Sequence, residues 1–463
     1  MGLAFHVENF GCRAARADGE AVTDRLRASG HCLEEPSAAD VVIVNTCSVT
    51  AEADREARAY IRRTHRHNPA ARIVVTGCYA QRAPRELAAL PGVAAVIGNS
   101  HKALAPAIVA GLAAPPTLPA GLLPVHTLLR SGAADPAAIF ADDRFAHSFL
   151  EEAQLVPGAQ TRPNLKIQEG CGNRCTFCVI PHTRGNSRSL AEDKVLAQVR
   201  GFVEAGGKEL VLSGINLGRW GRDLPPGGTA PPSLARLLRR IFADTSLPRL
   251  RLSSIEPMDW DQDLIGLLRE FGATRLARHA HLPLQSGSDS VLRRMHRRYR
   301  PWHYIEKVHA LVDAAGPDLT LGADVMAGFP GETDAEFGQT VEMIRRLPFG
   351  YLHLFPFSPR PGTRGWDLHR EAPVARAVVD ERMAVLRALA REKIHAHRSA
   401  FIGRSLESIT LNTPELLRRR SRTAALTENF LPIEMEGCLP ANHCVSIRVT
   451  AVTAEATLVG ARW

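Results

Sequence analysis

The sequence has no apolar run long enough to cross a bilayer, since no stretch of about eighteen residues is free of charge. Its first residues, MGLAFHVENFGC, show neither a basic leader followed by an apolar core nor a cleavage site. Cysteine is sparse, with nine in 463 residues, which is too few for a disulfide scaffold. We therefore expect a cytoplasmic protein with no membrane partner, whose reduced cysteines are available to bind metal.

Aromatic residues make up only 6% of the chain, whereas hydrophobic residues make up 45% and charged residues 23%. That balance allows buried cores beneath a solvated surface, and the length predicts two or three domains. Lysine and arginine number 57 against 48 aspartates and glutamates, which gives a formal net charge of +9. A polyanionic partner fits this excess, and so does a solvated basic surface.

The first hundred residues alternate apolar strands with helical stretches, which is typical of a parallel α/β domain. Strands are predicted at residues 4–10, 40–46 and 72–77, and a helix at 52–67. Between Leu112 and Pro163 the sequence is rich in alanine, proline and glycine, which indicates a linker or a domain edge.

Six strand and helix units follow Pro163, with strands predicted in LKIQ, ELVLSG, LRLSSI, ARHAHLPL, DLTLGADVM and GYLHLFPF. Such a series predicts a complete or partial β/α (TIM-type) barrel, with its chemistry on the loops beyond the carboxyl ends of the strands. A helix over 376–397 would close it, and SLESITL, CVSIRVTAV and ATLVG then predict a small β-barrel. The fold class is therefore α/β, with domains expected at 1–140, 141–398 and 399–463.

The sharpest motif is QEGCGNRCTFCVIPHTRG, in which Cys171, Cys175 and Cys178 are spaced as CxxxCxxC. Three thiolates on one loop can hold three irons of a 4Fe-4S cluster and leave the fourth iron open to a substrate. Structural zinc is the alternative, but it usually takes four protein ligands, and no fourth ligand is evident nearby.

A second group of cysteines is dispersed through the first domain. Cys12, Cys47 and Cys78 each come just beyond the carboxyl end of a predicted strand, in ENFGC, VNTC and VTGC. In a parallel sheet those ends share one edge, so the three thiols could meet at one metal. The alternative is that they are small buried hydrophobic residues. Cys32, Cys438 and Cys444 have no such setting, and we interpret them as structural.

The combined pattern resembles the methylthiotransferase family of radical S-adenosylmethionine enzymes, and the resemblance covers nearly the whole chain. It includes NTCSVTAEADREAR, VVTGCYAQR, the CxxxCxxC segment, LSGINLG, SSIEP, HLPLQSGSD, ADVMAGFPGET and LFPFSPRPGT. It implies a radical S-adenosylmethionine barrel in the centre and a C-terminal module like TRAM, a small β-barrel linked to RNA binding. It also implies two 4Fe-4S clusters and two molecules of S-adenosylmethionine per product, one as methyl donor and one as source of a 5'-deoxyadenosyl radical.

By that resemblance, Cys171, Cys175 and Cys178 would bind the radical-generating cluster. Cys12, Cys47 and Cys78 would bind an auxiliary cluster whose open iron holds the sulfur to be transferred. Candidates to bind S-adenosylmethionine lie in the cysteine motif and at the barrel strand ends, where each could instead be a cap or turn residue: Phe177, Gly214, Asn216, Ser254, Glu256, Gln285, Ser286 and Asp324. The run GFPGET is expected to form a tight turn that leads into a helix.

The residues after Cys47 resemble most the class that acts on N6-threonylcarbamoyladenosine in tRNA, next to the anticodon at position 37. Other members act on isopentenyladenosine in tRNA or on an aspartate of a ribosomal protein. A radical enzyme of another reaction class and a noncatalytic RNA-binding or iron-storage protein also remain open. The expected partners are tRNA, a reduced electron donor of the flavodoxin or ferredoxin type, and a sulfur donor.

Two basic stretches are candidates to contact the tRNA backbone, although a solvated face would look the same. One is the helix after Cys47 and the other is a run in the last domain; their arginines are Arg62, Arg63, Arg66, Arg418, Arg419, Arg420 and Arg422. Aromatic residues suited to stack on a base are few in the last domain, and Phe430 is one candidate.

Overall fold

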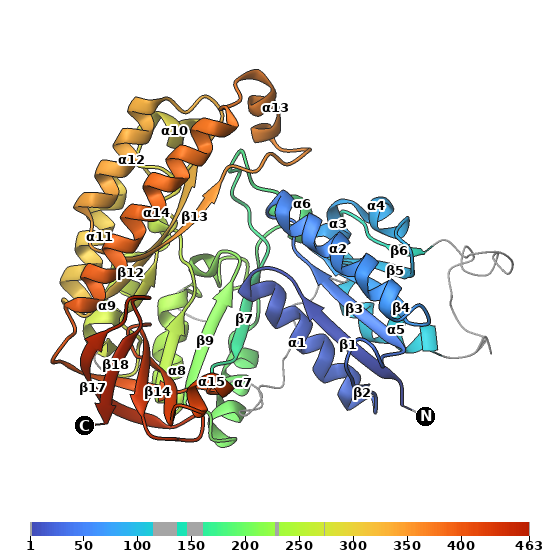
Figure 1. Ribbon diagram of the computed structural model, residues 1–463, viewed down its shortest axis with the longest axis horizontal. Helices are drawn as coiled ribbons and strands as arrows, with labels where there is room; N and C mark the ends of the chain where they lie inside the picture. The colour runs from blue at the N-terminus through green and yellow to red at the C-terminus, as the bar shows by residue number, and fades with distance from the viewer. Residues whose placement is uncertain (1, 114–136, 146–160, 227–230, 273, 463) are drawn as a thin grey trace, which may run out of the picture.

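The computed structural model describes residues 2–113, 137–145, 161–226, 231–272 and 274–462. Its strands fall into an N-terminal sheet, a central barrel-like arc and a small C-terminal barrel (Figure 1). Most of the predicted linker lies outside the described residues. None of the helices in the described ranges is both long and apolar enough to cross a membrane.

The N-terminal sheet has six parallel strands in the order β2-β1-β3-β4-β5-β6. Its strands alternate burial between two faces: Val42 and Val44 pack under α2, α3 and α4, whereas Val41 and Ile43 pack under α1 and α5. The bounds are β1 Ala4–Asn9, α1 Arg13–Ala28, β2 Cys32–Leu33, β3 Val41–Thr46, α2 Ala51–His67, β4 Arg72–Gly77, α3 Cys78–Arg82, α4 Pro84–Ala88, β5 Val93–Gly98, η1 Asn99–Leu104, α5 Ala105–Ala113 and β6 Ala138–Phe140.

The central strands β7, β9, β10, β11, β12 and β13 run parallel in chain order. They form two hydrogen-bonded groups joined by a single bridge between Leu250 and Leu276, and within the described residues the arc does not close. The predicted partial barrel is thus confirmed. Its strands are β7 Asn164–Glu169, the antiparallel β8 Arg188–Ser189, β9 Glu209–Gly214, β10 Arg249–Leu252, β11 His279–His281, β12 Thr320–Ala327 and β13 Phe349–Pro356.

Helices cover the outside of this arc and bury leucine-rich faces in one large core (Figure 1). The helix predicted at 376–397 is observed as α14. The bounds are α6 Ile180–Arg184, α7 Glu192–Glu204, η3 Leu217–Arg219, α8 Leu234–Asp244, η4 Pro257–Asp259, α9 Gln262–Phe271, α10 Asp289–Arg294, α11 Pro301–Ala315, α12 Asp334–Arg346, α13 Arg364–Glu371 and α14 Arg376–Ser399.

The GFPGET run forms the expected turn into a helix. Gly328 and Gly331 both have positive φ, at 77° and 69°, which favours glycine. Thr333 then caps α12, and its side chain and that of Glu336 form a reciprocal capping box. The turn is held from outside because the carboxylate of Glu332 accepts hydrogen bonds from Gly328 N and Arg382 Nη1.

The C-terminal residues form a closed five-stranded barrel, in the order β14-β15-β16-β18-β17, as predicted. Its elements are β14 Ser405–Thr410, α15 Glu415–Arg418, β15 Arg422–Thr427, β16 Pro432–Glu436, β17 Cys444–Val452 and β18 Leu458–Arg462. This barrel packs on the amino end of the central strands. There the carboxylate of Glu428 accepts hydrogen bonds from the backbone N and from the side-chain Nε of Arg278.

Phe430 lies in that junction, between His279 and Tyr351 of the central strands, with ring centroids 4.5 Å and 5.8 Å away. The guanidinium of Arg251 covers the same ring at 5.2 Å. The expectation that Phe430 stacks on a base is therefore wrong, because its ring is committed to the junction between the two barrels.

Candidate functional site

Cys171, Cys175 and Cys178 lie on the loop that follows β7, at the carboxyl end of the central strands. All three line one cavity of about 510 Å³, a size typical of small-molecule sites. The other lining residues are mostly polar and come from this loop, from α6 and the residue Asn186 beyond it, from His296 and from the start of α13: Gly172, Asn173, Arg174, Thr176, Pro181, His182, Asn186, His296, Gly362, Thr363 and Arg364.

Polar groups donate to the sulfurs of this loop. Asn173 N lies 3.4 Å and Asn216 Nδ2 lies 3.7 Å from Cys171 Sγ. Arg297 Nη1 lies 3.2 Å from Cys175 Sγ, while its Nη2 donates to both oxygens of Glu256 at 2.9 and 2.6 Å. Sulfurs surrounded by donors are suited to carry negative charge, as metal-bound thiolates do.

The thiols of this loop are crowded and partly dehydrated. Burial and the neighbouring Cys175 raise the pKa of the Cys178 thiol to about 12. Burial also raises the pKa of Cys171, against the hydrogen bonds from Asn173 and Asn216. Since a metal binds thiolates and displaces their protons, a metal centre relieves this crowding, and the three thiols fit such a centre.

Cys12, Cys47 and Cys78 also converge. Cys12 precedes α1, Cys47 follows β3 and Cys78 begins α3, so all three lie at the carboxyl edge of the N-terminal sheet. Burial, together with the nearby Cys78 and Cys12, raises the pKa of Cys47 to about 12. Gly11 packs so closely on Cys47 that a Cβ there would lie 3.0 Å from its sulfur. The second group of thiols therefore fits a metal centre as well.

The residues next to Cys47 and Cys78 are held by a shared carboxylate. Ser48 Oγ lies 2.9 Å from Asp54 Oδ1, in the first turn of α2. Arg82, at the end of α3, donates to Ser48 Oγ and Asp54 Oδ2, both at 2.7 Å. Arg360, beyond β13, also contacts both side chains. The segments carrying the two cysteines are thus fixed to each other and to the central domain.

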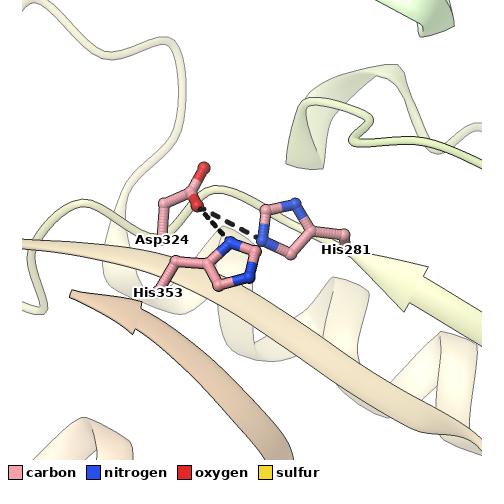
Figure 2. A group of neighbouring side chains, drawn as sticks. All are labelled: His281, Asp324 and His353. Atoms are coloured by element: carbon pink, nitrogen blue, oxygen red, sulfur yellow. Dashed lines mark ion pairs between the residues drawn. The ribbon is translucent and has the colours of Figure 1, made fainter. Parts of the chain in front are cut away.

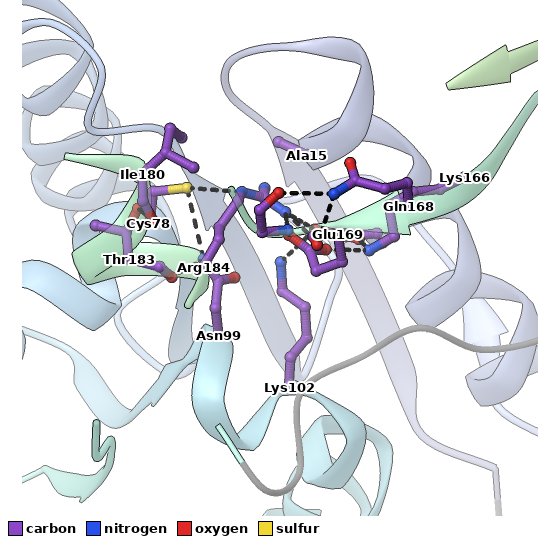
Figure 3. A network of polar contacts seen from close by, with 12 residues as sticks. Ala15, Cys78, Asn99, Lys102, Lys166, Gln168, Glu169, Ile180, Thr183 and Arg184 are labelled. Atoms are coloured by element: carbon purple, nitrogen blue, oxygen red, sulfur yellow. Dashed lines mark hydrogen bonds and ion pairs between the residues drawn. The ribbon is translucent and has the colours of Figure 1, made fainter. Parts of the chain in front are cut away.

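The sulfur of Cys78 lies at the boundary between the two domains (Figure 3). It accepts from Arg184 Nε at 3.3 Å and from Asn99 Nδ2 at 3.5 Å. Arg184 belongs to α6, just after the central cysteine loop, and is 1% exposed. Its Nη1 also donates to both oxygens of Glu169, at 2.8 and 3.0 Å. One short helix therefore connects the central cysteine loop with the other cysteine site.

A third polar group, formed by His281, Asp324 and His353, comes from β11, β12 and β13 (Figure 2). Asp324 Oδ1 lies 3.3 Å from His281 Nε2 and 3.3 Å from His353 Nδ1. Although burial opposes it, contact with the two imidazoles holds the pKa of Asp324 well below its ordinary value. The side chain of His353 is 60% exposed, so this group faces open space on one side.

Residues 4–98 match the Uncharacterized protein family UPF0004, and residues 165–344 match the Radical SAM superfamily. The chain is 33% identical to Threonylcarbamoyladenosine tRNA methylthiotransferase MtaB of Aquifex aeolicus, covering 94% of this chain and 97% of that protein. Identity to the protein of the same name from Bacillus subtilis is also 33%, over 94% of this chain and 90% of the relative. The chain belongs to the methylthiotransferase family of radical S-adenosylmethionine enzymes.

Enzymes of this family use 4Fe-4S clusters and S-adenosylmethionine, and the two groups of cysteines fit that use. A further relative is tRNA-2-methylthio-N(6)-dimethylallyladenosine synthase of Sorangium cellulosum. It is 35% identical over 87% of this chain and 80% of its own length. The family is thus matched by relatives that act on two different modified adenosines.

Three of the eight candidates for S-adenosylmethionine binding lie at the central cysteines: Phe177, Asn216 and Glu256. Asn216 contacts a cysteine sulfur directly, and Glu256 does so through Arg297. Gly214 is the last residue of β9, and Ser254 is half-buried in the loop beyond β10. Phe177, half-buried within the loop itself, packs against the central core.

Gln285, Ser286 and Asp324 have other surroundings. Gln285 has φ of 63°, a strained conformation for this residue, and its N donates to Asp324 O at 2.7 Å. Ser286 is fully buried, and its Oγ bonds to Thr340 Oγ1 and to Ser288 N. These contacts favour a packing role for Ser286. Asp324 faces two histidines, and its binding to the cofactor remains a prediction.

The candidate RNA-binding arginines lie on two separate elements. Arg62, Arg63 and Arg66 are exposed on α2, with the guanidinium of Arg63 5.3 Å from the ring of Tyr60. In the C-terminal domain, Arg418 and Arg419 share Glu415, Arg422 pairs with Glu434, and Arg420 is exposed.

The sequence did not single out Arg184, Arg297, His281 or His353. Arg184 could have been found, because it stands in the PHTRG segment directly after the cysteine motif. Arg297 lies in RRMHRRYR, where nothing marks one arginine among five. Cys32, Cys438 and Cys444, which we interpreted as structural, are exposed and form no part of a core.

Proposed function

We propose that this chain converts N6-threonylcarbamoyladenosine at position 37 of tRNA to its 2-methylthio derivative, consuming two molecules of S-adenosylmethionine per turnover. The observation that carries the proposal is the presence of two separate groups of three converging cysteines in adjacent domains. The names of the relatives from Aquifex aeolicus and Bacillus subtilis support the substrate.

In this proposal Cys171, Cys175 and Cys178 hold the radical-generating 4Fe-4S cluster, and Cys12, Cys47 and Cys78 hold the auxiliary one. The clusters supply the electron that cleaves S-adenosylmethionine and the iron that carries the transferred sulfur, chemistry that side chains cannot perform. The cavity lined by these three cysteines would hold S-adenosylmethionine, and Asn216 and Glu256 contact the cysteines from outside its lining, Asn216 at Cys171 and Glu256 through Arg297.

The chain's own residues orient these parts. Glu256 fixes the guanidinium of Arg297, which in turn points at Cys175 Sγ. Asp324 orients His281 and His353, and the exposed His353 would contact the nucleoside. The arginines of α2 and of the 418–422 run would bind phosphates of the tRNA, which carries one negative charge per nucleotide.

We also propose the remaining assignments. The domain limits 1–140, 141–398 and 399–463 are supported by the strands, since β6 pairs in the first sheet and β14 begins the last barrel. A reduced flavodoxin or ferredoxin would supply electrons, a separate protein or sulfide would supply sulfur, and the protein would act in the cytoplasm.

Nucleoside analysis tests the substrate directly. Mass spectrometry of tRNA from cells lacking this protein should show loss of 2-methylthio-N6-threonylcarbamoyladenosine, with recovery on expression of the intact chain. A second candidate substrate is isopentenyladenosine in tRNA, favoured by the 35% identity to the Sorangium cellulosum enzyme. Loss of the methylthio form of isopentenyladenosine instead would select that candidate.

A further inference from the structure

The side chain of Arg184 reaches from the central domain to Cys78 of the other cysteine site (Figure 3). It stands six positions after Cys178, at the end of α6, the short helix that follows the loop of the central cysteines. Its Nε nevertheless reaches the sulfur of Cys78 in the other domain, at 3.3 Å. Asn99 Nδ2 approaches the same sulfur at 3.5 Å and is held by the carbonyl of Thr183 at 2.8 Å.

The orientation of this guanidinium is fixed on one side by carboxylates. Nη1 donates to both oxygens of Glu169 and lies 3.2 Å from Asp18 Oδ2. Lys166 pairs with the same two carboxylates, and Lys102 pairs with Asp18. The network is almost fully buried. With Nη1 engaged in this way, Nε and Nη2 are left for the cysteine side.

Nη2 of Arg184 is buried and has no hydrogen-bond partner among the residues that the structure describes. A buried cationic donor without an acceptor is destabilising, because it has lost its hydrogen bonds to water. Cys78 and Cys12 both lie close enough to interact electrostatically with the guanidinium. An anionic sulfur centre bounded by these cysteines would supply the missing acceptor.

On the basis of the proposed function, we propose that Arg184 is a positioning residue of the auxiliary cluster. Its guanidinium donates hydrogen bonds to sulfur at the centre held by Cys12, Cys47 and Cys78, and raises that centre's reduction potential. Hydrogen bonds and positive charge stabilise the reduced form more than the oxidised form, because reduction adds negative charge to the sulfurs. Arg297, which donates to Cys175, is the matching residue of the other cluster.

The test is a potentiometric titration, followed by electron paramagnetic resonance, of the anaerobically reconstituted full-length chain. Each cluster is observed alone, in a variant in which the three cysteines that bind the other cluster are replaced by alanine. Arg184→Gln should shift the one-electron equilibrium of the auxiliary cluster toward the oxidised form at least tenfold, about 59 mV. The same substitution should leave the central cluster unchanged, and Arg297→Gln should give the opposite pattern.

Arg184→Lys keeps the charge but loses the forked donors, so it should give a smaller shift in the same direction. It also serves if Arg184→Gln fails to fold. An unchanged auxiliary potential in both variants would overturn the proposal, as would equal shifts of both clusters. If the wild-type chain assembles no auxiliary cluster, the proposed function itself fails, and that result is seen before any variant is compared.

Discussion

Arg360, beyond β13, forms a buried ion pair with Asp54 in the first turn of α2, 306 residues earlier in the chain. The two side chains are 3% and 6% exposed. Arg82 pairs with the same carboxylate at 2.7 Å. One aspartate thus pairs with two arginines beside the segments that carry Cys47 and Cys78, and removing it leaves both without this counterion.

Asp54→Ala should therefore destabilise the N-terminal domain by about 3 kcal/mol, the range found when one partner of a buried pair is removed. Hydrogen exchange of residues 47–54 and chemical denaturation would measure the loss. Asp380→Ala is the matched control, since Asp380 pairs with the exposed Arg376, and it should cost no more than about 0.5 kcal/mol. Similar losses in the two variants would contradict a special role for Asp54.

The two cysteine groups predict a definite iron content. Anaerobically reconstituted wild-type chain should contain about eight irons, four for each group. Cys47→Ala should lower this to about four and should keep cleavage of S-adenosylmethionine while abolishing methylthio transfer. Cys444→Ala, at an exposed cysteine, is the control and should retain all eight. Zinc in either site, or an unchanged product yield in Cys47→Ala, would rule out the assignment.

Asp324 holds His281 and His353 together, so Asp324→Asn removes the charge that orients both rings. We expect turnover to fall about 100-fold, the low end for loss of an acid–base or positioning group. Iron content and the spectra of both clusters should stay as in the wild type. Asp289→Asn, at a half-buried aspartate that pairs with Arg293 and Arg300, should be active. A variant at Asp324 with full turnover would remove this group from the active site.

The arginines of α2 predict salt-dependent binding of tRNA. Arg62→Glu together with Arg66→Glu should weaken binding and reduce the slope of log affinity against log salt by about 1.5. Arg387→Glu with Arg391→Glu is a matched control, because these arginines are exposed on α14 at the same spacing. Equal losses from the two pairs would indicate only a general effect of charge.

His397 predicts how stability depends on pH. Burial lowers the pKa of this imidazole to about 4, and its Nε2 lies 2.9 Å from Thr320 Oγ1 on β12. As the pH falls, His397 is protonated in the unfolded chain before it is protonated in the folded chain. The contribution of the neutral, buried His397 to stability is therefore complete above about pH 6.5 and is lost as the pH falls toward 4. When the pH is lowered from 7.5 to 5.5, the free energy of unfolding of the wild type should fall by about 1 kcal/mol more than that of His397→Asn. Parallel pH profiles would contradict this.

The sequence predicted the architecture well where local periodicity decides it. Strands such as 40–46 and 72–77 are continuous apolar runs, and their register in a parallel sheet follows from burial on both faces. β11 is shorter than expected, with three residues, because Pro283 cannot donate to the ladder and the chain turns at Gln285. The two-residue strands β2 and β8 carry too little pattern to be predicted.

The site was predicted only in part, for a physical reason. The cysteines could be found because spacing and strand ends place them, whereas Arg184, Arg297 and His353 act across contacts between distant segments. Arg297 contacts Cys175, which is 122 residues away along the chain, and Arg184 contacts Cys78, which is 106 residues away. Nothing local distinguishes Arg297 from the many arginines that solvate the surface, whereas Arg184 is marked only by its place directly after the cysteine motif.

The position of the C-terminal barrel has a consequence for the size of the RNA. Phe430 and Glu428 pack against the amino end of the central strands, whereas the cysteine loop lies at their opposite end (Figure 1). An RNA that touches the 418–422 arginines while presenting one base at the cysteine loop has to run along the outside of the molecule for the full length of those strands. A lone nucleoside cannot bridge that span, so only a longer RNA is able to use both ends.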